Sequence, residues 1–540
     1  MSTIRSFFET ARRQGPRLAW KHGAREWTWF QAATDVRRVA RALIALGVRP
    51  GDSVSIVGPN RPEWVMADLG ALAAGAVPAP IYPTLTAEQT RYIADHSGAA
   101  VAVVSDETQE AKLRGTGVRF FARMTGWEDF LARGDGTPDS VPDSVIDERL
   151  AAIKPDDVAT LIYTSGTTGP PKAVMLTHRN VEFAAETAVR AASTTPDDVL
   201  LSYLPLSHVA EQIISIHTAS LIGGAVWFCD DLERLPEVLR AARPTIFFGV
   251  PRVWEKMQAR IEGTVRGASP LRRRMFAWAR SSRSRIADRL VRSKVRAALG
   301  LDRARLCVSG AAKMPRPTLD FFDSLGLPLL DAWGMTESTA MGSGNLPLAR
   351  KPGTIGRPQQ GVEIRLAPDG EILTRGPHVF KGYYKDARAT REALDPDGFL
   401  HTGDVGELDG DGYLRITDRK KDLLITSGGK NVSPQNIEGL LGQIEGVAQA
   451  VVVGDGRKYL AALIVPEKPE RAADPGFVAQ VARGIERING QLAQYETIKR
   501  YRVLPAQFSV DSGELTPTLK LKRKVIAQKF AREIDELFSG

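Results

Sequence analysis

Residues 163–178, YTSGTTGPPKAVMLTH, combine glycines, hydroxyl side chains and a lysine, which is a composition suited to binding phosphate. Glycines let backbone N–H groups approach an anion closely, and the hydroxyls and the ammonium add donors and charge. A Walker A loop requires glycine, four residues and then Gly-Lys-Ser/Thr. Here Gly166 and Gly169 are three positions apart and Lys172 follows Pro171, so the segment predicts a phosphate-binding loop of another kind.

Other catalytic patterns find no support in the sequence. The seven histidines form no HExxH pattern for zinc, and no GxSxG nucleophile elbow indicates a thioesterase-type hydrolase. The two cysteines, Cys229 and Cys307, cannot build a disulfide framework, which favours a reducing compartment. The N-terminal residues include no apolar stretch typical of a signal peptide, so we expect a cytoplasmic protein.

The chain has 540 residues, too many for one compact core, so two or more domains are expected. Its hydrophobic content of 43% and charged content of 25% are those of an ordinary globular protein. The net charge of +9 is compatible with anionic substrates, a membrane surface, nucleic acid or simply a solvated basic surface. The apolar run at 65–82 is interrupted by Asp68, Pro78 and Pro80, which favours buried core over a membrane span.

Strands and helices alternate in the first hundred residues. LAWKHGAREWTW predicts a hairpin with Gly23 near its turn, and the spacing of apolar residues from Val36 to Leu43 predicts a helix that Gly47 ends. SVSIVG, AVPAPIY and VAVVS then predict buried strands, with a helix at 64–74 between the first two. This alternation indicates α/β layers with mostly parallel sheets.

The polar stretch TDRKKD divides the chain. We predict an N-terminal domain at 1–417, a hinge at 418–421 and a smaller α+β domain at 422–540. The C-terminal domain includes a helix with Ser433 as its N-cap and Pro434 at its first position.

Segment 266–305 is unusually basic, with thirteen lysines and arginines against two acidic residues, Asp288 and Asp302. Interleaved apolar residues make it resemble a basic amphipathic helix. Three interpretations stay open, which are a solvated face on a packed helix, peripheral contact with anionic lipid at the inner face of the membrane, and nucleic acid. No recognition motif accompanies the segment, and we therefore expect no nucleic acid partner.

Segment 163–178 resembles the phosphate loop of the adenylate-forming superfamily, which comprises acyl-CoA synthetases, amino-acid adenylation domains and firefly luciferase. Five further stretches match motifs of that superfamily in the same order: SGAAKMP (309–315), WGMTES (333–338), GEILTRGPHVFKGYY (370–384), the long motif at 401–434 and LTPTLKLKRK (515–524). The resemblance covers nearly the whole chain. It implies a large N-terminal domain of layered α/β subdomains and a small mobile α+β C-terminal domain.

The resemblance also implies ATP, Mg²⁺ and CoA as cofactors or co-substrates. In the superfamily a carboxylate attacks the α-phosphate of ATP to form acyl-AMP, and a thiol then displaces AMP. The positions implied to bind ATP or AMP are Thr164, Ser165, Gly166, Thr167, Thr168, Gly169, Lys172, Gly310, Ala311, Ala312, Trp333, Gly334, Met335, Thr336, Asp404 and Arg419.

The remaining roles follow from the same resemblance. Thr164 and Glu337 are expected to hold Mg²⁺, which accepts few protein ligands beside phosphates and water. The catalytic set is expected to be Lys520, Glu337, His208 and Lys172, with Lys520 bridging the carboxylate and the α-phosphate. Lys421 corresponds to the hinge, and Gly428 and Gly429 are expected to line the pantetheine tunnel.

The segment 204–212, LPLSHVAEQ, holds no aspartate to pair with an amino-acid amine. Together with GVPRVWEKM and the basic insert, it most resembles the bacterial long-chain fatty-acid–CoA ligases. Three alternatives remain: a ligase for medium-chain or aryl acids, a fatty-acyl-AMP ligase that delivers its product to a carrier protein, and a non-catalytic binding module. The carrier-dependent type usually has an insertion near the hinge, and none occurs between Ile416 and Pro434.

Overall fold

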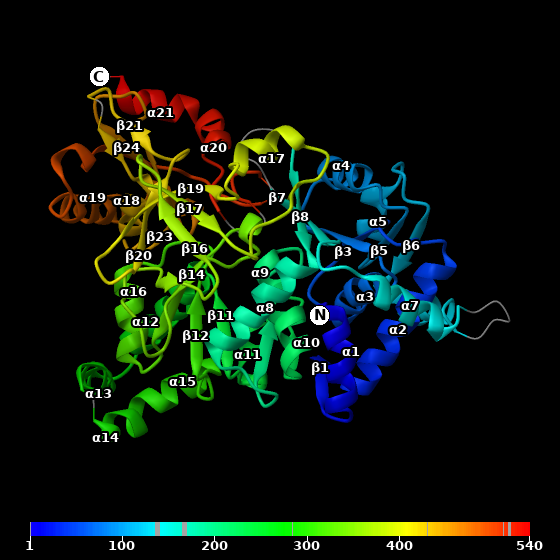
Figure 1. Cartoon of the computed structure of the whole chain (residues 1–540). Coiled ribbons are helices and arrows are strands. Elements are labelled where there is room, and N and C mark those ends of the chain that lie inside the picture. Colours follow the sequence, from blue (N-terminus) through cyan, green and yellow to red (C-terminus); the bar gives the residue numbers. More distant parts are fainter. Residues whose placement is uncertain are drawn as a thin grey trace.

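The structure is a computed structural model that describes residues 2–135, 141–164, 170–282, 284–428, 430–510, 512–516 and 520–539. The N-terminal elements occupy one side of the molecule, and the elements that follow residue 420 gather at the opposite upper corner (Figure 1). Between them lie the sheets that carry the predicted nucleotide motifs.

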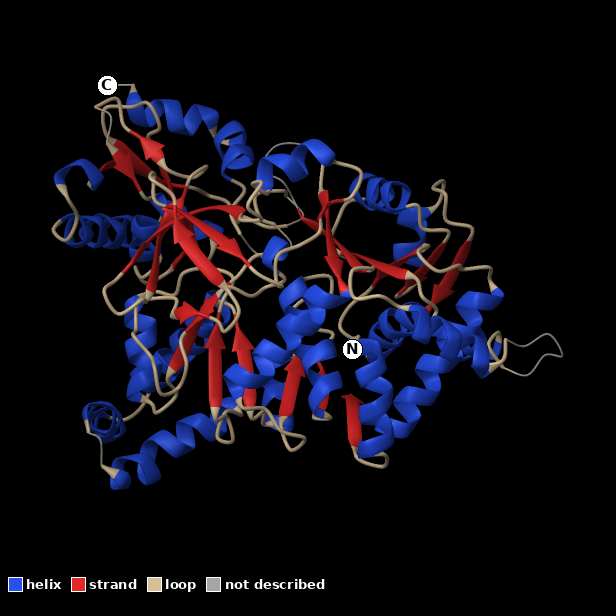
Figure 2. Ribbon diagram, in the orientation of Figure 1, coloured by secondary structure: helices blue, strands red, loops and turns tan. Residues whose placement is uncertain are grey.

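The first sheet is parallel throughout, with strand order β4-β3-β5-β6, and its apolar residues are buried because helices pack on it (Figure 2). This arrangement confirms the strands predicted from SVSIVG, AVPAPIY and VAVVS and the helix between the first two. Its elements are β3 (Ser53–Val57), α3 (Pro62–Ala73), β4 (Val77–Ile81), α4 (Ala87–Ser97), β5 (Val101–Val104), α5 (Glu107–Leu113), β6 (Phe120–Arg123), η1 (Met124–Gly126), α6 (Trp127–Ala132) and α7 (Asp143–Ala152).

The predicted N-terminal hairpin forms the edge of a second sheet, with order β2-β1-β10-β9. The helix predicted to follow it is also confirmed, since it ends at Ala45, with Leu46 as its C-cap before Gly47. The elements of this layer are α1 (Thr3–Gln14), β1 (Leu18–His22), β2 (Arg25–Thr28), α2 (Trp29–Ala45), α8 (His178–Ala192), β9 (Val199–Ser202), α9 (Val209–Glu211), the π-helix η2 (Gln212–Thr218), α10 (Ala219–Ile222) and β10 (Ala225–Phe228).

A third sheet has the order β11-β12-β13-β14-β15, and its first three strands are parallel. Its buried apolar side chains share a core with α11, α12 and α16. The elements are α11 (Leu235–Ala242), β11 (Ile246–Gly249), α12 (Pro251–Arg266), β12 (Leu306–Ser309), α16 (Arg316–Ser324), β13 (Leu329–Trp333), η4 (Thr336–Ser338), β14 (Ser343–Gly344) and β15 (Arg357–Pro358).

Two further sheets are antiparallel, so the prediction of mostly parallel sheet holds only for the sheets described above. Their orders are β18-β8-β7 and β16-β17-β19-β20. The pairs β7–β8, β16–β17 and β19–β20 are joined by short connections, which suit antiparallel pairing, whereas parallel strands need long crossovers. β18 instead reaches β8 from more than two hundred residues away. Their elements are β7 (Val158–Thr164), β8 (Lys172–Thr177), β16 (Glu363–Leu366), β17 (Glu371–Arg375), β18 (Gly382–Tyr383), α17 (Ala387–Ala393), β19 (Leu400–Leu408) and β20 (Leu414–Arg419).

The C-terminal segment is α+β, with two cores of its own. Ser433 does stand at the N-cap of a helix, but its hydroxyl donates to the Thr417 carbonyl at 3.1 Å rather than capping that helix. The elements are β21 (Leu424–Ile425), β22 (Asn431–Val432), α18 (Pro434–Leu441), β23 (Val447–Val453), β24 (Leu460–Pro466), η5 (Pro469–Ala473), α19 (Pro475–Asn489), η6 (Gln494–Glu496), β25 (Ile498–Val503), α20 (Arg523–Lys529) and α21 (Ala531–Phe538).

The basic segment is not one amphipathic helix, which corrects the sequence-based expectation. It is divided into α13 (Pro270–Ser281), α14 (Arg285–Ala287), the π-helix η3 (Asp288–Arg292) and α15 (Ser293–Leu299). The chain is extended at Ser282, and the Arg292 guanidinium donates to the carbonyls of Ser282 and Ser284 at 3.0 and 2.9 Å. These bonds satisfy polar groups at the corner, so α13 and α14 project together as a lobe (Figure 1).

The apolar run at 65–82 forms α3 and β4, and both are buried. Among the helices of the described ranges, none combines the length and the apolar character needed to cross a bilayer. The prediction that this run is core is therefore confirmed.

Candidate active site

The described ends of the predicted phosphate loop lie side by side in an antiparallel pair. Thr164 ends β7 and pairs with Lys172 at the start of β8, and the Thr164 hydroxyl donates to the Lys172 carbonyl at 3.5 Å. The predicted positions between them, Ser165, Gly166, Thr167, Thr168 and Gly169, lie outside the described residues. Lys172 directs its ammonium over the ring of Tyr383, 4.9 Å from the ring centroid.

Glu337 occupies a short 3-10 turn that is held in place from several sides. Its side chain is largely buried, the Tyr383 hydroxyl donates to its Oε1 at 2.8 Å, and its carbonyl accepts from the Phe380 N–H at 2.9 Å. Two and three residues further on, Thr339 and Ala340 have left-handed φ angles of +51° and +59°. Such a conformation is costly for non-glycine residues and indicates a constrained turn.

The turn before Glu337 requires glycine at 334. A Cβ at Gly334 would lie 2.3 Å from the backbone carbon of Ala340, closer than any side chain tolerates. The Met335 N–H donates to the hydroxyl of Ser338 at 3.0 Å, which closes the turn at Thr336. Predicted residues 334–336 therefore form the connection from β13 to Glu337.

Trp333, Asp404 and Arg419 meet although they are far apart in the chain. Asp404 and Arg419 are paired across β19 and β20, and Arg419 Nε lies 2.8 Å from Asp404 Oδ1. The indole N–H of Trp333 donates to the other carboxylate oxygen at 2.8 Å. Trp333 thus keeps a polar contact without the phenol oxygen that tyrosine would bring. The three side chains offer a flat ring, an acceptor and a cation, a set able to bind a nucleoside.

The segment Gly310–Ala312 follows β12 at the carboxyl end of parallel strands, where ligands commonly bind in α/β sheets. A Cβ at Gly310 would lie 3.1 Å from the ring of Phe248, so glycine allows this ring to pack closely. Ala311 has a left-handed φ of +68°. The adjacent Lys313 donates to the amide oxygen of Asn436 at 2.5 Å, joining this loop to α18.

Lys520, from the C-terminal segment, lies close enough to other predicted site residues for their charges to affect its pKa. Its backbone forms reciprocal bonds with Thr516, of 2.8 and 3.0 Å. The pKa of Lys520 is lowered to about 8, chiefly by burial and also by the charge of Arg419, while Asp404 and Glu337 act in the opposite direction. The fold therefore brings these four charged groups to one site.

His208 stands at the start of α9, and its Nδ1 accepts from the Ala210 N–H at 3.2 Å. Burial lowers the pKa of His208 to about 4, and the positive charge of Lys520 acts in the same direction. At neutral pH the imidazole is uncharged and carries its proton on Nε2. It can donate one hydrogen bond, but it is poorly suited to act as a cation.

The lowered pKa of Lys520 predicts an alkaline limit on acyl-AMP formation. Because the protonated ammonium is the useful form and is lost as pH rises through about 8, kcat/KM should fall about tenfold per pH unit above that value. Pyrophosphate release measured from pH 6 to 10 checks this result. Lys520→Arg should be less active but should lose the alkaline fall; an unchanged profile in this variant would assign the limit to another group.

The predicted hinge and tunnel positions that the structure describes lie on the surface. Lys421 and Gly428 are exposed, and a Cβ at Gly428 would meet only Thr426 Oγ1, at 3.9 Å. Gly429 lies outside the described residues. The C-terminal segment is tied to the rest by the Lys313 bond and by an ion pair between Arg266 and Glu445.

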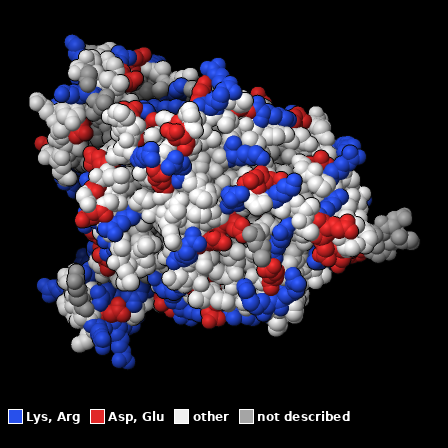
Figure 3. All heavy atoms as spheres, in the orientation of Figure 1, with Lys and Arg blue, Asp and Glu red and all other residues white. Residues whose placement is uncertain are grey.

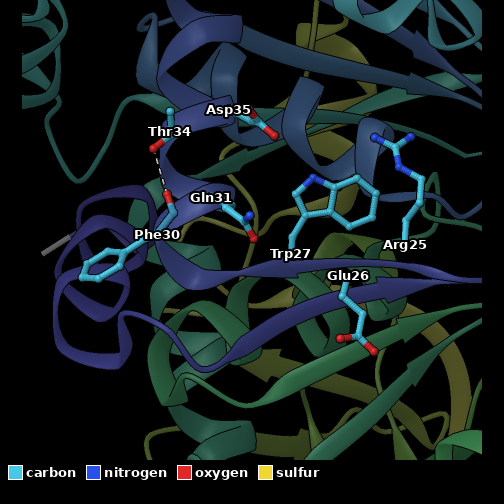
Figure 4. A pocket seen from close by; sticks show the side chains of 7 residues that line it. All are labelled: Arg25, Glu26, Trp27, Phe30, Gln31, Thr34 and Asp35. Atoms are coloured by element: carbon cyan, nitrogen blue, oxygen red, sulfur yellow. Dashed lines mark hydrogen bonds between the residues drawn. The ribbon is translucent and has the colours of Figure 1, made fainter.

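A surface hollow of about 440 Å³ lies elsewhere, between β2 and the start of α2 (Figure 4). It contains none of the predicted site residues. The Arg25 guanidinium covers the ring of Trp27 at 4.5 Å and pairs with Glu63 at 3.1 Å. Its positive charge is therefore already paired with a carboxylate. The lining residues are Arg25, Glu26, Trp27, Phe30, Gln31, Thr34 and Asp35.

The described residues contain no group of three or more His, Cys, Asp or Glu side chains arranged to hold a metal ion alone. Glu337 with the Thr164 hydroxyl can supply two oxygens. That donor set fits Mg²⁺ bound jointly with substrate phosphates, because Mg²⁺ takes few carboxylates and keeps waters and phosphate oxygens.

Sequence reasoning gave no role to Tyr383, although it lies in the quoted stretch 370–384. Its contacts with Glu337 and Lys172 appear only when β18 pairs with β8. Tyr384 is next to it in the chain, and nothing in the sequence shows which of the two tyrosines contacts Glu337.

The model of the family described as AMP-binding enzyme matches residues 7–384, and that described as AMP-binding enzyme C-terminal domain matches residues 421–540. The chain belongs to the AMP-binding enzyme family. The predicted membership of the adenylate-forming superfamily and the predicted fold class are thereby confirmed. ATP as a substrate follows from this AMP-binding family.

The chain aligns with its relatives over nearly its whole length. The chain is 36% identical to a long-chain-fatty-acid–CoA ligase, FadD15, of Mycobacterium bovis, over 95% of this chain and 92% of that protein. It is 34% identical to a long-chain-fatty-acid–CoA ligase, ACSBG2, of Xenopus laevis, over 99% and 84%. Among solved AMP-binding enzyme structures, ATP-bound MatB of Rhodopseudomonas palustris superposes with a TM-score of 0.75 at 25% identity, over 98% and 99%.

Proposed function

We propose that this protein converts a long-chain fatty acid to acyl-AMP with ATP and then to acyl-CoA, releasing pyrophosphate and AMP. The observation that carries the proposal is the convergence of Lys520, Glu337, Asp404 and Arg419 on one site in a chain of this family. The choice of a long-chain acid draws on relatives named long-chain-fatty-acid–CoA ligases, which match 95% or more of the chain.

In the first step the fatty-acid carboxylate attacks the α-phosphorus of ATP. A bond forms between the carboxylate oxygen and phosphorus, and the bond to the β-phosphate oxygen breaks. We assign Lys520 to bridge the carboxylate and the α-phosphate, because a buried ammonium offsets negative charge more strongly than an exposed one. Lys172 and the loop beside it take the β- and γ-phosphates.

The nucleoside is assigned to the opposite side of the site. Asp404, whose carboxylate is held by Trp333 and Arg419, accepts from the ribose hydroxyls. The Trp333 ring and residues Gly310–Ala312 frame the adenine. Together these groups would hold the nucleotide with its α-phosphate toward Lys520.

Glu337 and Thr164 are the residues that we assign to Mg²⁺. The metal ion would neutralise phosphate charge that develops as pyrophosphate leaves. We assign His208, neutral and with its proton on Nε2, to donate a hydrogen bond near Lys520.

In the second step the thiolate of CoA attacks the acyl carbonyl, a C–S bond forms and AMP leaves. We assign Lys421 to the hinge about which residues 422–540 turn, with 1–417 as the N-terminal domain. The exposed position of Gly428 agrees with a role in another arrangement of the two domains, in which glycines 428 and 429 line the pantetheine path.

Product analysis tests the proposal. The protein is incubated with ATP, Mg²⁺, CoA and an acid series from acetate to oleate, with benzoate included. We expect AMP, pyrophosphate and acyl-CoA, with turnover greatest for long chains. Acyl-AMP that accumulates despite CoA would favour transfer to a carrier protein, a peak at medium-chain or aryl acids would change the substrate class, and no turnover would overturn the proposal.

We also propose that the α13–α14 lobe touches anionic lipid. Of the fourteen large apolar side chains exposed in the described structure, five lie in this lobe and the adjoining η3: Leu271 (67%), Met275 (37%), Trp278 (44%), Ile286 (65%) and Leu290 (46%). Exposed arginines surround them, and the lobe carries a concentration of basic side chains (Figure 3). An apolar surface ringed by cations matches a bilayer that presents negative headgroups.

Vesicle sedimentation tests this contact. Replacing Arg272, Arg273 and Arg274 by alanine should weaken binding to phosphatidylserine-containing vesicles up to about 100-fold, since each basic residue contributes about 1 kcal/mol. A control variant removes two exposed arginines elsewhere, Arg388 and Arg532, and should bind as the parent does. Equal binding by all three proteins would exclude the lobe as the lipid contact.

A further inference from the structure

Tyr383 lies between the two parts of the site that must act on phosphate. It belongs to β18, a two-residue strand that pairs with Val174 and Met175 of β8, two and three residues beyond Lys172. The Phe380 ring packs edge-on against it, with the ring centroids 4.9 Å apart. The Tyr383 N–H donates to the Thr390 hydroxyl at 2.9 Å. The hydrogen bond fixes the backbone of Tyr383 and the Phe380 ring packs against its side chain, so the orientation of the phenol is restricted.

The two ends of this side chain contact two different charged groups. The hydroxyl donates to Glu337 Oε1 at 2.8 Å, and the face of the ring receives the Lys172 ammonium at 4.9 Å. A hydrogen bond to an ionised carboxylate is short and directional, so it selects one orientation of the carboxylate. A cation over an aromatic face is attracted by the ring quadrupole, which limits where the ammonium can sit.

We propose that Tyr383 is a positioning residue that sets the Glu337 carboxylate and the Lys172 ammonium in one mutual arrangement for metal-bound ATP. The inference rests on the proposed function, because it assumes that these two groups receive Mg²⁺ and the terminal phosphates. Residues that hydrogen-bond to a metal-binding carboxylate typically change metal affinity by 10- to 100-fold when removed. The phenol is suited to this work because it keeps its proton at neutral pH and can only donate to an ionised carboxylate.

The two contacts can be separated by substitution. Tyr383→Phe removes the hydroxyl and keeps the ring, whereas Tyr383→Leu removes both. Tyr384→Phe is the matched control, since the Tyr384 ring stands edge-on to His96 at 5.7 Å on the other side of the strand. Melting temperatures of all variants confirm that each one is folded before its binding is compared.

The experiment measures ATP affinity by titration calorimetry in the presence of Mg²⁺ and again in EDTA. Tyr383→Phe should weaken binding about 10-fold with Mg²⁺ and leave it unchanged in EDTA. Tyr383→Leu should also lose affinity in EDTA, because Lys172 is no longer oriented. In a Glu337→Gln background, Tyr383→Phe should add less than about a twofold effect, since the metal-binding carboxylate that it orients has become a neutral amide.

Three results would overturn the inference: equal losses with and without Mg²⁺ in Tyr383→Phe, a full additional loss in the Glu337→Gln background, or an effect of Tyr384→Phe as large as that of Tyr383→Phe. Calorimetry requires no acid substrate. Its result therefore stands whether or not the protein turns over a long-chain acid, and a failure of the proposed function remains a separate finding.

Discussion

Replacement of Lys520 by alanine is expected to slow acyl-AMP formation from ATP and fatty acid by about 100- to 1000-fold, as does the loss of one oxyanion donor in other enzymes. The physical reason is the loss of a buried positive charge that faces both the incoming carboxylate and the α-phosphate. Burial increases this contribution, because water screens the ammonium poorly there. Pyrophosphate release in the absence of CoA isolates this step.

Two controls limit the interpretation of that result. Thioester formation from supplied acyl-AMP should change less than about threefold, because the positive charge acts in the first step. Lys524→Ala removes an exposed ammonium four residues away and should behave like the parent protein. A large loss of activity in Lys524→Ala together with normal activity in Lys520→Ala would contradict the assignment of Lys520 as the catalytic lysine.

Replacement of Glu337 by glutamine is expected to reduce acyl-AMP formation about 100-fold at low Mg²⁺, with partial recovery at high Mg²⁺. The amide keeps the size of the side chain but removes its charge, so the metal loses its carboxylate ligand, while the Tyr383 hydroxyl can still donate to the amide oxygen. Initial rates measured across a Mg²⁺ series at fixed ATP test this expectation.

Glu407→Gln provides the comparison for Glu337→Gln, since Glu407 is exposed on β19. Its Mg²⁺ dependence should match that of the parent. The assignment of Glu337 to the metal would fail if Glu337→Gln lowered the rate equally at every Mg²⁺ concentration. The backbone near Glu337 is strained at Thr339 and Ala340, so the substitution could also disturb this turn. Thermal unfolding detects such a disturbance as a lowered melting temperature.

Much of the local structure could be predicted from the order of residues. Alternating apolar runs located β3, β4 and β5, and Gly47 marked the end of α2, because periodicity and chain-breaking residues act over a few positions. The arrangement of the sheets near the phosphate segment could not be predicted in this way. Strand direction depends on which strands meet, and the pairing of β8 with β18 joins residues more than two hundred positions apart.

The basic segment shows the same limit at the level of one helix. Its composition predicted an amphipathic helix, but the break at Ser282 depends on the Arg292 guanidinium, which turns back to bond carbonyls ten and eight residues earlier. Ser433 likewise has a residue type that favours capping, yet its hydroxyl bonds to Thr417 in the preceding sheet. In both places a hydrogen bond to a residue distant in the chain replaced the structure that the local sequence favours.

The sequence by itself determined the family and its residue types, since the phosphate segment and five further stretches follow one another in the order of the superfamily. Only the tertiary structure decided that the Trp333 indole meets Asp404 and that Tyr383, rather than Tyr384, contacts Glu337. Side chains of a site come from positions as distant as 172 and 520, and their mutual distances are set by sheet pairing and domain contact. No periodicity in one segment carries that information.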